Sequence, residues 1–74
     1  MWQTTDEQIQ KIFSFDDFAS ALAFVNKIGA LAEAAHHHPD IELGWGRVVV
    51  RLTTHSAGGV TQKDTDLAKE IDAL

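Results

Sequence analysis

The residues best suited to chemistry in this chain are its four histidines, which fall in two places. His36, His37 and His38 form one run, and His55 stands alone after a stretch rich in β-branched residues. Imidazole is the side chain that most readily donates and accepts a proton near neutral pH. Two imidazoles in different electrostatic surroundings can divide the roles of acid and base between them. The histidines therefore indicate proton-transfer chemistry, provided that the fold brings the two places together.

An acidic residue and a proline near the histidine run bear on which imidazoles could act together. Glu33 precedes His37 by four residues, so on a helix the two side chains share a face and the carboxylate could orient the imidazole. Successive helical residues are turned by about 100°, so three neighbouring histidines cannot all face one pocket on an intact helix. Pro39 disfavours helical backbone just before it, and we therefore expect the helix to be unwound at His38.

The same cluster allows two other interpretations. Histidines at the end of a helix commonly cap its last carbonyl groups and take part in no reaction. Alternatively, two histidines of the run, together with His55 and Glu33, could bind a catalytic zinc ion that keeps one position open for water. Neighbouring histidines on a regular helix rarely chelate one ion, and the usual His-x-x-x-His spacing is absent, so we expect no metal.

The elements that must position these residues can be predicted from the pattern of apolar side chains. Residues 8–15 favour a strand, and residues 1–4 a short partner strand that turns back through residues 5–7. Asp16 and Asp17 are suited to begin a helix, which Pro39 would end. The expected apolar stripe of that helix consists of Phe18, Leu22, Val25, Ile28, Ala32 and Ala35. Phe24 and Leu31 form a second apolar edge, where we expect part of a contact between subunits.

The second half of the chain predicts a hairpin followed by a helix. Ile41, Leu43 and Trp45 alternate with smaller or polar residues, which is typical of a half-buried strand with Trp45 in the core. Gly46 marks a turn or bulge, residues 47–53 alternate as a second strand, and residues 56–59 form a loop. Thr61 and the residue three positions later resemble a capping box, and the helix that follows carries Leu67, Ala68, Ile71 and Leu74 on one face. The expected fold class is α+β, an antiparallel sheet of three to four strands with two helices packed on one face.

The composition limits what kind of protein this can be. With 74 residues the chain is expected to form a single domain, residues 1–74, with a small core. Because it has no cysteine, no disulfide or thiolate metal site can reinforce that core, and we expect self-association. A net charge of -5 with scattered basic residues argues against nucleic-acid binding. No apolar run approaches the length of a membrane span and no signal peptide is recognisable, so we expect no membrane association and a cytoplasmic location.

The residues discussed above keep a definite spacing along the chain. Three residues separate Glu33 from His37-His38-Pro39, and five separate that run from Trp45. Nine residues then lead to His55, and eight more to Asp64. This spacing resembles the signature of the pterin-4a-carbinolamine dehydratases. Residues 13–18 resemble the strand-to-helix junction of that family, and residues 52–55 and 59–64 resemble its second conserved block. The resemblance extends from about Trp2 to the C-terminus.

The resemblance implies an activity and roles for individual residues. Members of the family remove water from 4a-hydroxytetrahydrobiopterin, or a related pterin, to give quinonoid dihydropterin in tetrahydrobiopterin recycling, and they need no cofactor. The implied catalytic residues are His37, His38 and His55, with His37 and His55 as the acid–base pair and His38 holding the pterin. Glu33 would orient His37, and Asp64 would cap the last helix and brace the loop of His55.

The family also implies partners. Its members are homodimers or homotetramers with a four-stranded sheet. Some also serve as a transcriptional coactivator-like dimerisation partner through a helical surface, so a non-catalytic binding module is the alternative function. His36 falls at a variable position of the signature and is expected to be a solvated bystander.

Overall fold

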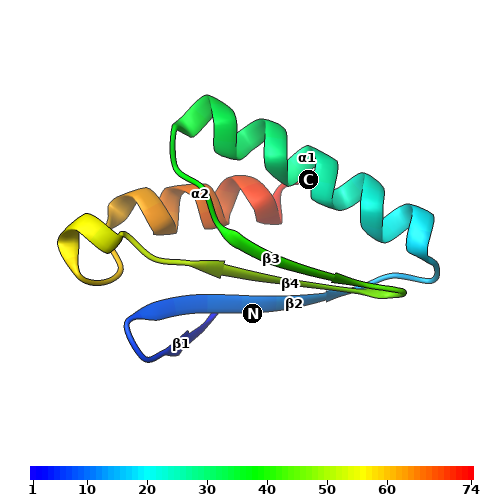
Figure 1. Ribbon diagram of the computed structural model, residues 1–74, viewed down its shortest axis with the longest axis horizontal. Helices are drawn as coiled ribbons and strands as arrows, with labels where there is room; N and C mark the ends of the chain where they lie inside the picture. Colours follow the sequence, from blue (N-terminus) through cyan, green and yellow to red (C-terminus); the bar gives the residue numbers. More distant parts are fainter.

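The computed structural model, which describes residues 1–74, contains a four-stranded antiparallel sheet (Figure 1). The strands are β1 (Gln3–Thr5), β2 (Gln8–Ser14), β3 (Asp40–Gly44) and β4 (Arg47–Leu52). Their order in the sheet is β1-β2-β4-β3, so the two longest strands lie at the centre. The short partner strand predicted before β2 is therefore present, joined to it by a turn at Asp6 and Glu7.

Two helices cover one face of this sheet (Figure 1). Helix α1 (Phe18–Ala35) begins at Asp17, whose carboxylate accepts from the Ser20 amide over 2.7 Å. Helix α2 (Gln62–Asp72) packs beside it at the same face. The core between the helices and the sheet contains Ile9, Ala21, Ile28, Val48, Val50, Leu52, Leu67, Ala68 and Ile71. The predicted α+β architecture, with two helices on one face of an antiparallel sheet, is confirmed.

The face that α1 turns to the sheet differs from the prediction. Phe24 stacks against Phe13 and Phe15, with ring centroids 4.8 and 5.1 Å apart, and Leu31 also packs on the core. Phe18 and Leu22 are instead 46% and 40% exposed. Phe24 and Leu31, predicted as a second apolar edge of the helix, thus pack on the core of the domain, and the subunit contact expected there stays a prediction. The apolar stripe of α1 is wide enough to allow more than one rotation about the helix axis, and the packing of Phe24 on Phe13 and Phe15 selects one of them.

Trp45 is not a core residue. Its side chain is 71% exposed because Gly44 pairs with Arg47, which leaves Trp45 and Gly46 as the two-residue turn of the hairpin. The predicted turn at Gly46 is confirmed. A Cβ atom there would lie 2.7 Å from the Phe15 carbonyl oxygen, so the close approach of this turn to the end of β2 requires glycine.

Helix α1 has the length and composition of a membrane span. It comprises 18 residues with a mean hydropathy of 1.2, at the lower limit for crossing a bilayer. The expectation that no apolar run approaches this length therefore does not hold for α1. In the structure Ala21, Ile28 and Ala32 of this helix are buried against the rest of the domain, and core helices of globular domains pass the same test.

Candidate active site

The end of α1 sends the three neighbouring histidines in different directions. His36 adopts the left-handed conformation, with a φ of 51°. Its amide donates to the Glu33 carbonyl over 3.3 Å, and the His37 amide donates to the Ala32 carbonyl over 3.1 Å. These two bonds are those of a Schellman motif. The helix thus ends before the proline, and both His37 and His38 lie in the short irregular segment that leads to β3.

The first turn of α2 supplies a buried carboxylate. Thr61 is the N-cap residue, and its amide donates to Asp64 Oδ2 over 2.8 Å. The threonine hydroxyl accepts in return from the backbone of the first turn. This is the predicted capping box, with aspartate in place of the more usual glutamate or glutamine. The side chain of Asp64 is 0% exposed, so its remaining oxygen must also find a donor.

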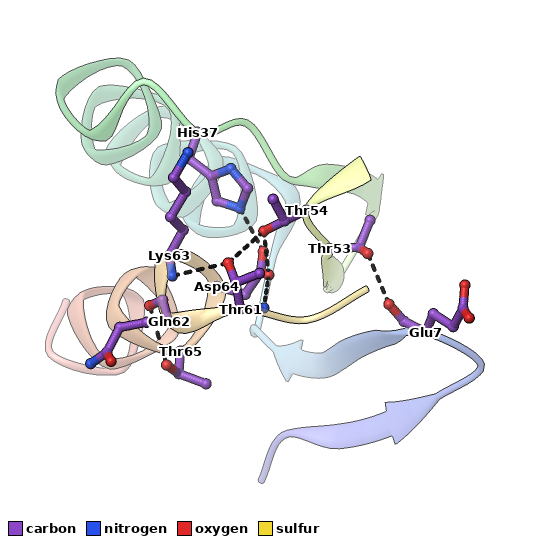
Figure 2. A network of polar contacts seen from close by, with 9 residues as sticks. All are labelled: Glu7, His37, Thr53, Thr54, Thr61, Gln62, Lys63, Asp64 and Thr65. Carbon is purple, nitrogen blue, oxygen red and sulfur yellow. Dashed lines mark hydrogen bonds and ion pairs between the residues drawn. The ribbon is translucent and has the colours of Figure 1, made fainter. Parts of the chain in front are cut away.

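That donor is His37, and the bond joins the segment after α1 to the first turn of α2 (Figure 2). Nε2 of His37 lies 2.5 Å from Asp64 Oδ1, and the Thr54 hydroxyl donates to Asp64 Oδ2 over 2.7 Å. The Thr54 hydroxyl also lies 2.8 Å from the Thr61 hydroxyl. Thr54 is the residue directly before His55 in the chain. Because an ionised carboxylate only accepts, Nε2 carries the hydrogen. Nδ1 is therefore the nitrogen of His37 that remains to exchange a proton.

The pKa of Asp64 lies below its ordinary value although the group is buried. Burial is the largest influence and would raise the pKa by itself. Hydrogen bonds from His37, the Thr61 amide and the Thr54 hydroxyl, together with the charge of His37, outweigh it. Asp64 is therefore ionised at neutral pH and presents a fixed negative charge to His37.

Glu33 forms its hydrogen bond with His38, not with His37 as predicted. The Glu33 carboxylate contacts His38 Nε2, and both side chains are largely exposed. The prediction assumed that helical spacing continues from Glu33 to His37, whereas the left-handed residue His36 ends that geometry. His37 turns toward α2, and His38 comes within reach of Glu33. Each of the two histidines thus has its own acidic partner.

His37, His38 and His55 line one hollow of about 360 Å³. His55 is the first residue of a short 3₁₀ helix (His55–Ala57), separated from the end of β4 by two residues. The His55 side chain is exposed. The other residues around the hollow are all polar: His36, Thr53, Thr54, Ser56 and Lys63. The structure thus brings the two histidine positions of the sequence to one place, where a ligand could touch both. The catalytic roles of these residues stay predictions.

A second, larger hollow adjoins the first. Its volume is about 710 Å³, and Thr53 and His55 line both hollows. The remaining walls are the β1–β2 turn, residues 6–8, and Gly58. The Thr53 hydroxyl donates to the Glu7 carbonyl over 2.8 Å, which fastens this turn to the end of β4 (Figure 2). Together the two hollows give the histidine site room for a ligand larger than one ring.

Two residues of the site were missed by the sequence analysis. Thr54 continues the inward-facing parity of Val48, Val50 and Leu52, so a hydroxyl at a core position was the available signal. Lys63 lines the histidine hollow from the first turn of α2, where a basic residue is unfavourable.

The arrangement of the acidic residues and histidines also bears on the zinc interpretation. No three histidine, aspartate or glutamate side chains come together in a set that could hold a metal ion. Of the candidate ligands, His38 is paired with Glu33, whereas His37 is paired with Asp64, which was not among them. The zinc interpretation therefore gains no ligand set from the structure.

Comparison with known proteins assigns this chain to a family. The sequence model described as "Pterin 4 alpha carbinolamine dehydratase" matches residues 1–74. The chain belongs to the pterin-4a-carbinolamine dehydratase family. The resemblance noted from the spacing of Glu33, the histidines and Asp64 is therefore confirmed at the level of the family.

Relatives in this family come from bacteria and archaea. A Picosynechococcus protein with the provisional name pterin-4-alpha-carbinolamine dehydratase is 55% identical over 99% of this chain and 79% of its own length. A similarly named protein of Natronomonas pharaonis is 47% identical over 99% of this chain and 79% of its own. These names identify the family and leave the activity of this chain to be proposed.

Solved structures of relatives have the same fold. A transcriptional coactivator/pterin dehydratase from Brucella melitensis superimposes with a TM-score of 0.92 at 39% identity, over 97% of this chain and 79% of its own. A pterin dehydratase-like protein identified as a RuBisCO assembly factor in the α-carboxysome gives a TM-score of 0.78 at 27% identity, over 99% and 84% of the two chains. Proteins with this fold are thus described both as dehydratases and as assembly factors.

Proposed function

We propose that this chain is a 4a-hydroxytetrahydropterin dehydratase, a hydro-lyase that converts the 4a-carbinolamine to quinonoid dihydropterin. The observation that carries the proposal is the meeting of three imidazoles, His37, His38 and His55, around one polar hollow. The membership of the chain in the pterin-4a-carbinolamine dehydratase family supports the choice of substrate. Tetrahydrobiopterin recycling is the process in which we place the activity.

The reaction needs two proton transfers. A proton is delivered to the hydroxyl oxygen, the bond between C4a and that oxygen breaks, and water leaves. A proton is lost from the neighbouring ring nitrogen, and its electron pair forms the new double bond to C4a. General acid–base catalysis by positioned imidazoles suits both transfers.

The surroundings of the histidines favour a division of these tasks. His37 and His55 act as the acid–base pair, since they line the same hollow from two different segments, the one after α1 and the one after β4. His38, held by Glu33, binds the pterin. Asp64 stabilises the positive charge that His37 carries when it is protonated, because the carboxylate is ionised and lies 2.5 Å from Nε2.

The proposal can be tested by stopped-flow absorbance of enzymically generated 4a-carbinolamine. The wild type should accelerate its decay, and His37→Ala and His55→Ala should each lower the rate constant by about 100-fold or more. His36→Ala serves as the control from the same run of histidines and should retain the wild-type rate. If purified wild type removes the intermediate no faster than buffer does, the proposed activity is wrong.

A second candidate function is a non-catalytic binding module. Phe18 and Leu22 leave apolar surface exposed on α1, and structural relatives are described as a coactivator and as an assembly factor. Such a module would capture a helical partner through α1 and have no need of an intact histidine set. Recovery of a helical partner by the wild type but not by Leu22→Glu, together with a silent dehydration assay, would favour this function over catalysis.

A further inference from the structure

Lys63 is the one basic side chain other than histidine that lines the histidine hollow. It occupies the second position of α2, between the N-cap residue Thr61 and the buried Asp64. Figure 2 shows its side chain extending from α2 toward the end of α1 at His37. The Lys63 side chain therefore lines the same hollow as the imidazoles.

No carboxylate neutralises this ammonium group. The four ion pairs of the structure join Lys11 to Asp72, Arg51 to Glu42, and two histidines to their acidic partners. Lys63 takes part in none of them, and its side chain forms no hydrogen bond. The ammonium is thus free to meet a ligand.

The position of Lys63 in its helix is electrostatically unfavourable. The N-terminus of a helix carries a partial positive charge, so the first turn favours acidic residues and disfavours lysine. Lys69, in the last turn of the same helix, stands at the favourable end. The stability of α2 therefore gives no reason for a lysine at position 63, and a residue that opposes local stability is expected mainly where function needs it.

We propose that Lys63 is a substrate-binding residue whose ammonium donates a hydrogen bond to the oxo group at C4 of the pterin. This inference rests on the proposed function. Imidazoles and hydroxyls in the hollow can each donate or accept, whereas an ammonium can only donate and the C4 oxo oxygen can only accept. C4 is bonded directly to C4a, the carbon that loses its hydroxyl. A pterin whose C4a faces the imidazoles therefore brings its oxo group into the same hollow as Lys63.

The test is a ligand comparison in which only the C4 substituent changes. 6-Hydroxymethylpterin carries the oxo group, and 2,4-diamino-6-hydroxymethylpteridine has an amino group in its place. Affinities for both are measured by fluorescence titration of the wild type, Lys63→Met and Lys63→Arg. Lys69→Met is the matched control, because it removes the same charge from the same helix outside the hollow.

We expect Lys63→Met to bind 6-hydroxymethylpterin about tenfold more weakly, which is the usual effect of losing one hydrogen bond to a charged group. Its affinity for the diamino compound should be unchanged or improved, and Lys63→Arg should recover part of the loss. Lys69→Met should bind like the wild type. The melting temperature of Lys63→Met should equal or exceed that of the wild type, since an unfavourable charge has left the helix N-terminus.

The possible failures can be told apart. If the wild type dehydrates the carbinolamine but Lys63→Met binds both compounds as the wild type does, the inference about Lys63 is wrong and the proposed function stands. If Lys63→Met loses affinity for both compounds equally, the lysine does not contact the oxo group, and the inference is again wrong. If the wild type neither dehydrates the carbinolamine nor binds either compound, the proposed function fails and the inference fails with it.

Discussion

Among the residues of the site, the two acidic partners of histidine differ most in burial. The side chain of Asp64 is 0% exposed and that of Glu33 is 78% exposed. A buried carboxylate with three donors contributes more to the free energy of unfolding than an exposed ion pair does. Removing it would leave buried donors without a hydrogen-bond partner or water. Position in the structure, and not residue type, therefore decides which acid matters to stability.

This difference predicts unequal effects of two amide substitutions. Asp64→Asn should lower the free energy of unfolding by about 1–3 kcal/mol, because the His37 and Thr54 donors lose an ionised acceptor. Glu33→Gln should change it by less than about 1 kcal/mol. Urea unfolding at pH 7 followed by circular dichroism measures both. Equal effects would show that the buried network contributes no more than the exposed pair.

The pKa of Asp64 also predicts how stability depends on pH. The folded-state pKa lies below the ordinary value of about 3.9, so the unfolded chain binds the proton more tightly. The contribution of Asp64 is therefore present above about pH 4 and is lost as the pH falls through the lowered folded pKa. Unfolding free energies at pH 6, 4 and 3 should decline less steeply in Asp64→Asn than in the wild type. A parallel decline in both proteins would contradict this account.

At the scale of elements, periodic patterns predicted most of the fold and local backbone geometry accounts for the rest. The strands, both helices and the capping box at Thr61 follow from alternation, helical spacing and N-cap residue types. The sequence does not reveal that α1 ends at a left-handed His36, because glycine is the residue that usually marks that conformation. That single residue decides whether Glu33 meets His37 or His38. The exchange of partners in the site thus comes from one unexpected φ angle.

The left-handed residue itself gives a prediction about α1. His36→Gly should raise the free energy of unfolding by about 0.5–1 kcal/mol, because a left-handed backbone strains every residue with a Cβ atom. The Schellman bonds that place His37 do not involve the His36 side chain, so the dehydration rate should be unchanged. Thermal unfolding and the stopped-flow assay measure the two quantities. A lower stability in His36→Gly would mean that the imidazole contributes more than its backbone strain costs.

At the scale of the whole molecule, contacts between distant segments were beyond the sequence analysis. The Trp2 indole and the Lys11 ammonium both donate to Asp72, over 2.9 and 2.7 Å, which joins the start of the chain to the end of α2. No periodicity pairs residues so far apart. The cytoplasmic location and the absence of nucleic-acid and membrane partners stay predictions, as does self-association. The last of these gains a specific surface from the structure.

That surface is one flank of α1. Only 13 of the 74 residues are buried, so the isolated chain has a small core, while Phe18 and Leu22 remain 46% and 40% exposed. Successive helical residues are turned by about 100°, so Phe18 and Leu22 share a flank and Ala23 lies on another. A second copy that covers this flank would remove both apolar side chains from water.

We therefore predict that the wild type is a homodimer or homotetramer and that Leu22→Glu lowers the number of subunits, because association would bury the new charge without a partner. Ala23→Glu is the matched control, since it adds the same charge to the adjacent exposed position and should leave assembly intact. Size-exclusion chromatography with light scattering measures all three proteins. A monomeric wild type would refute self-association, and an unchanged Leu22→Glu assembly would place the contact away from this flank of α1.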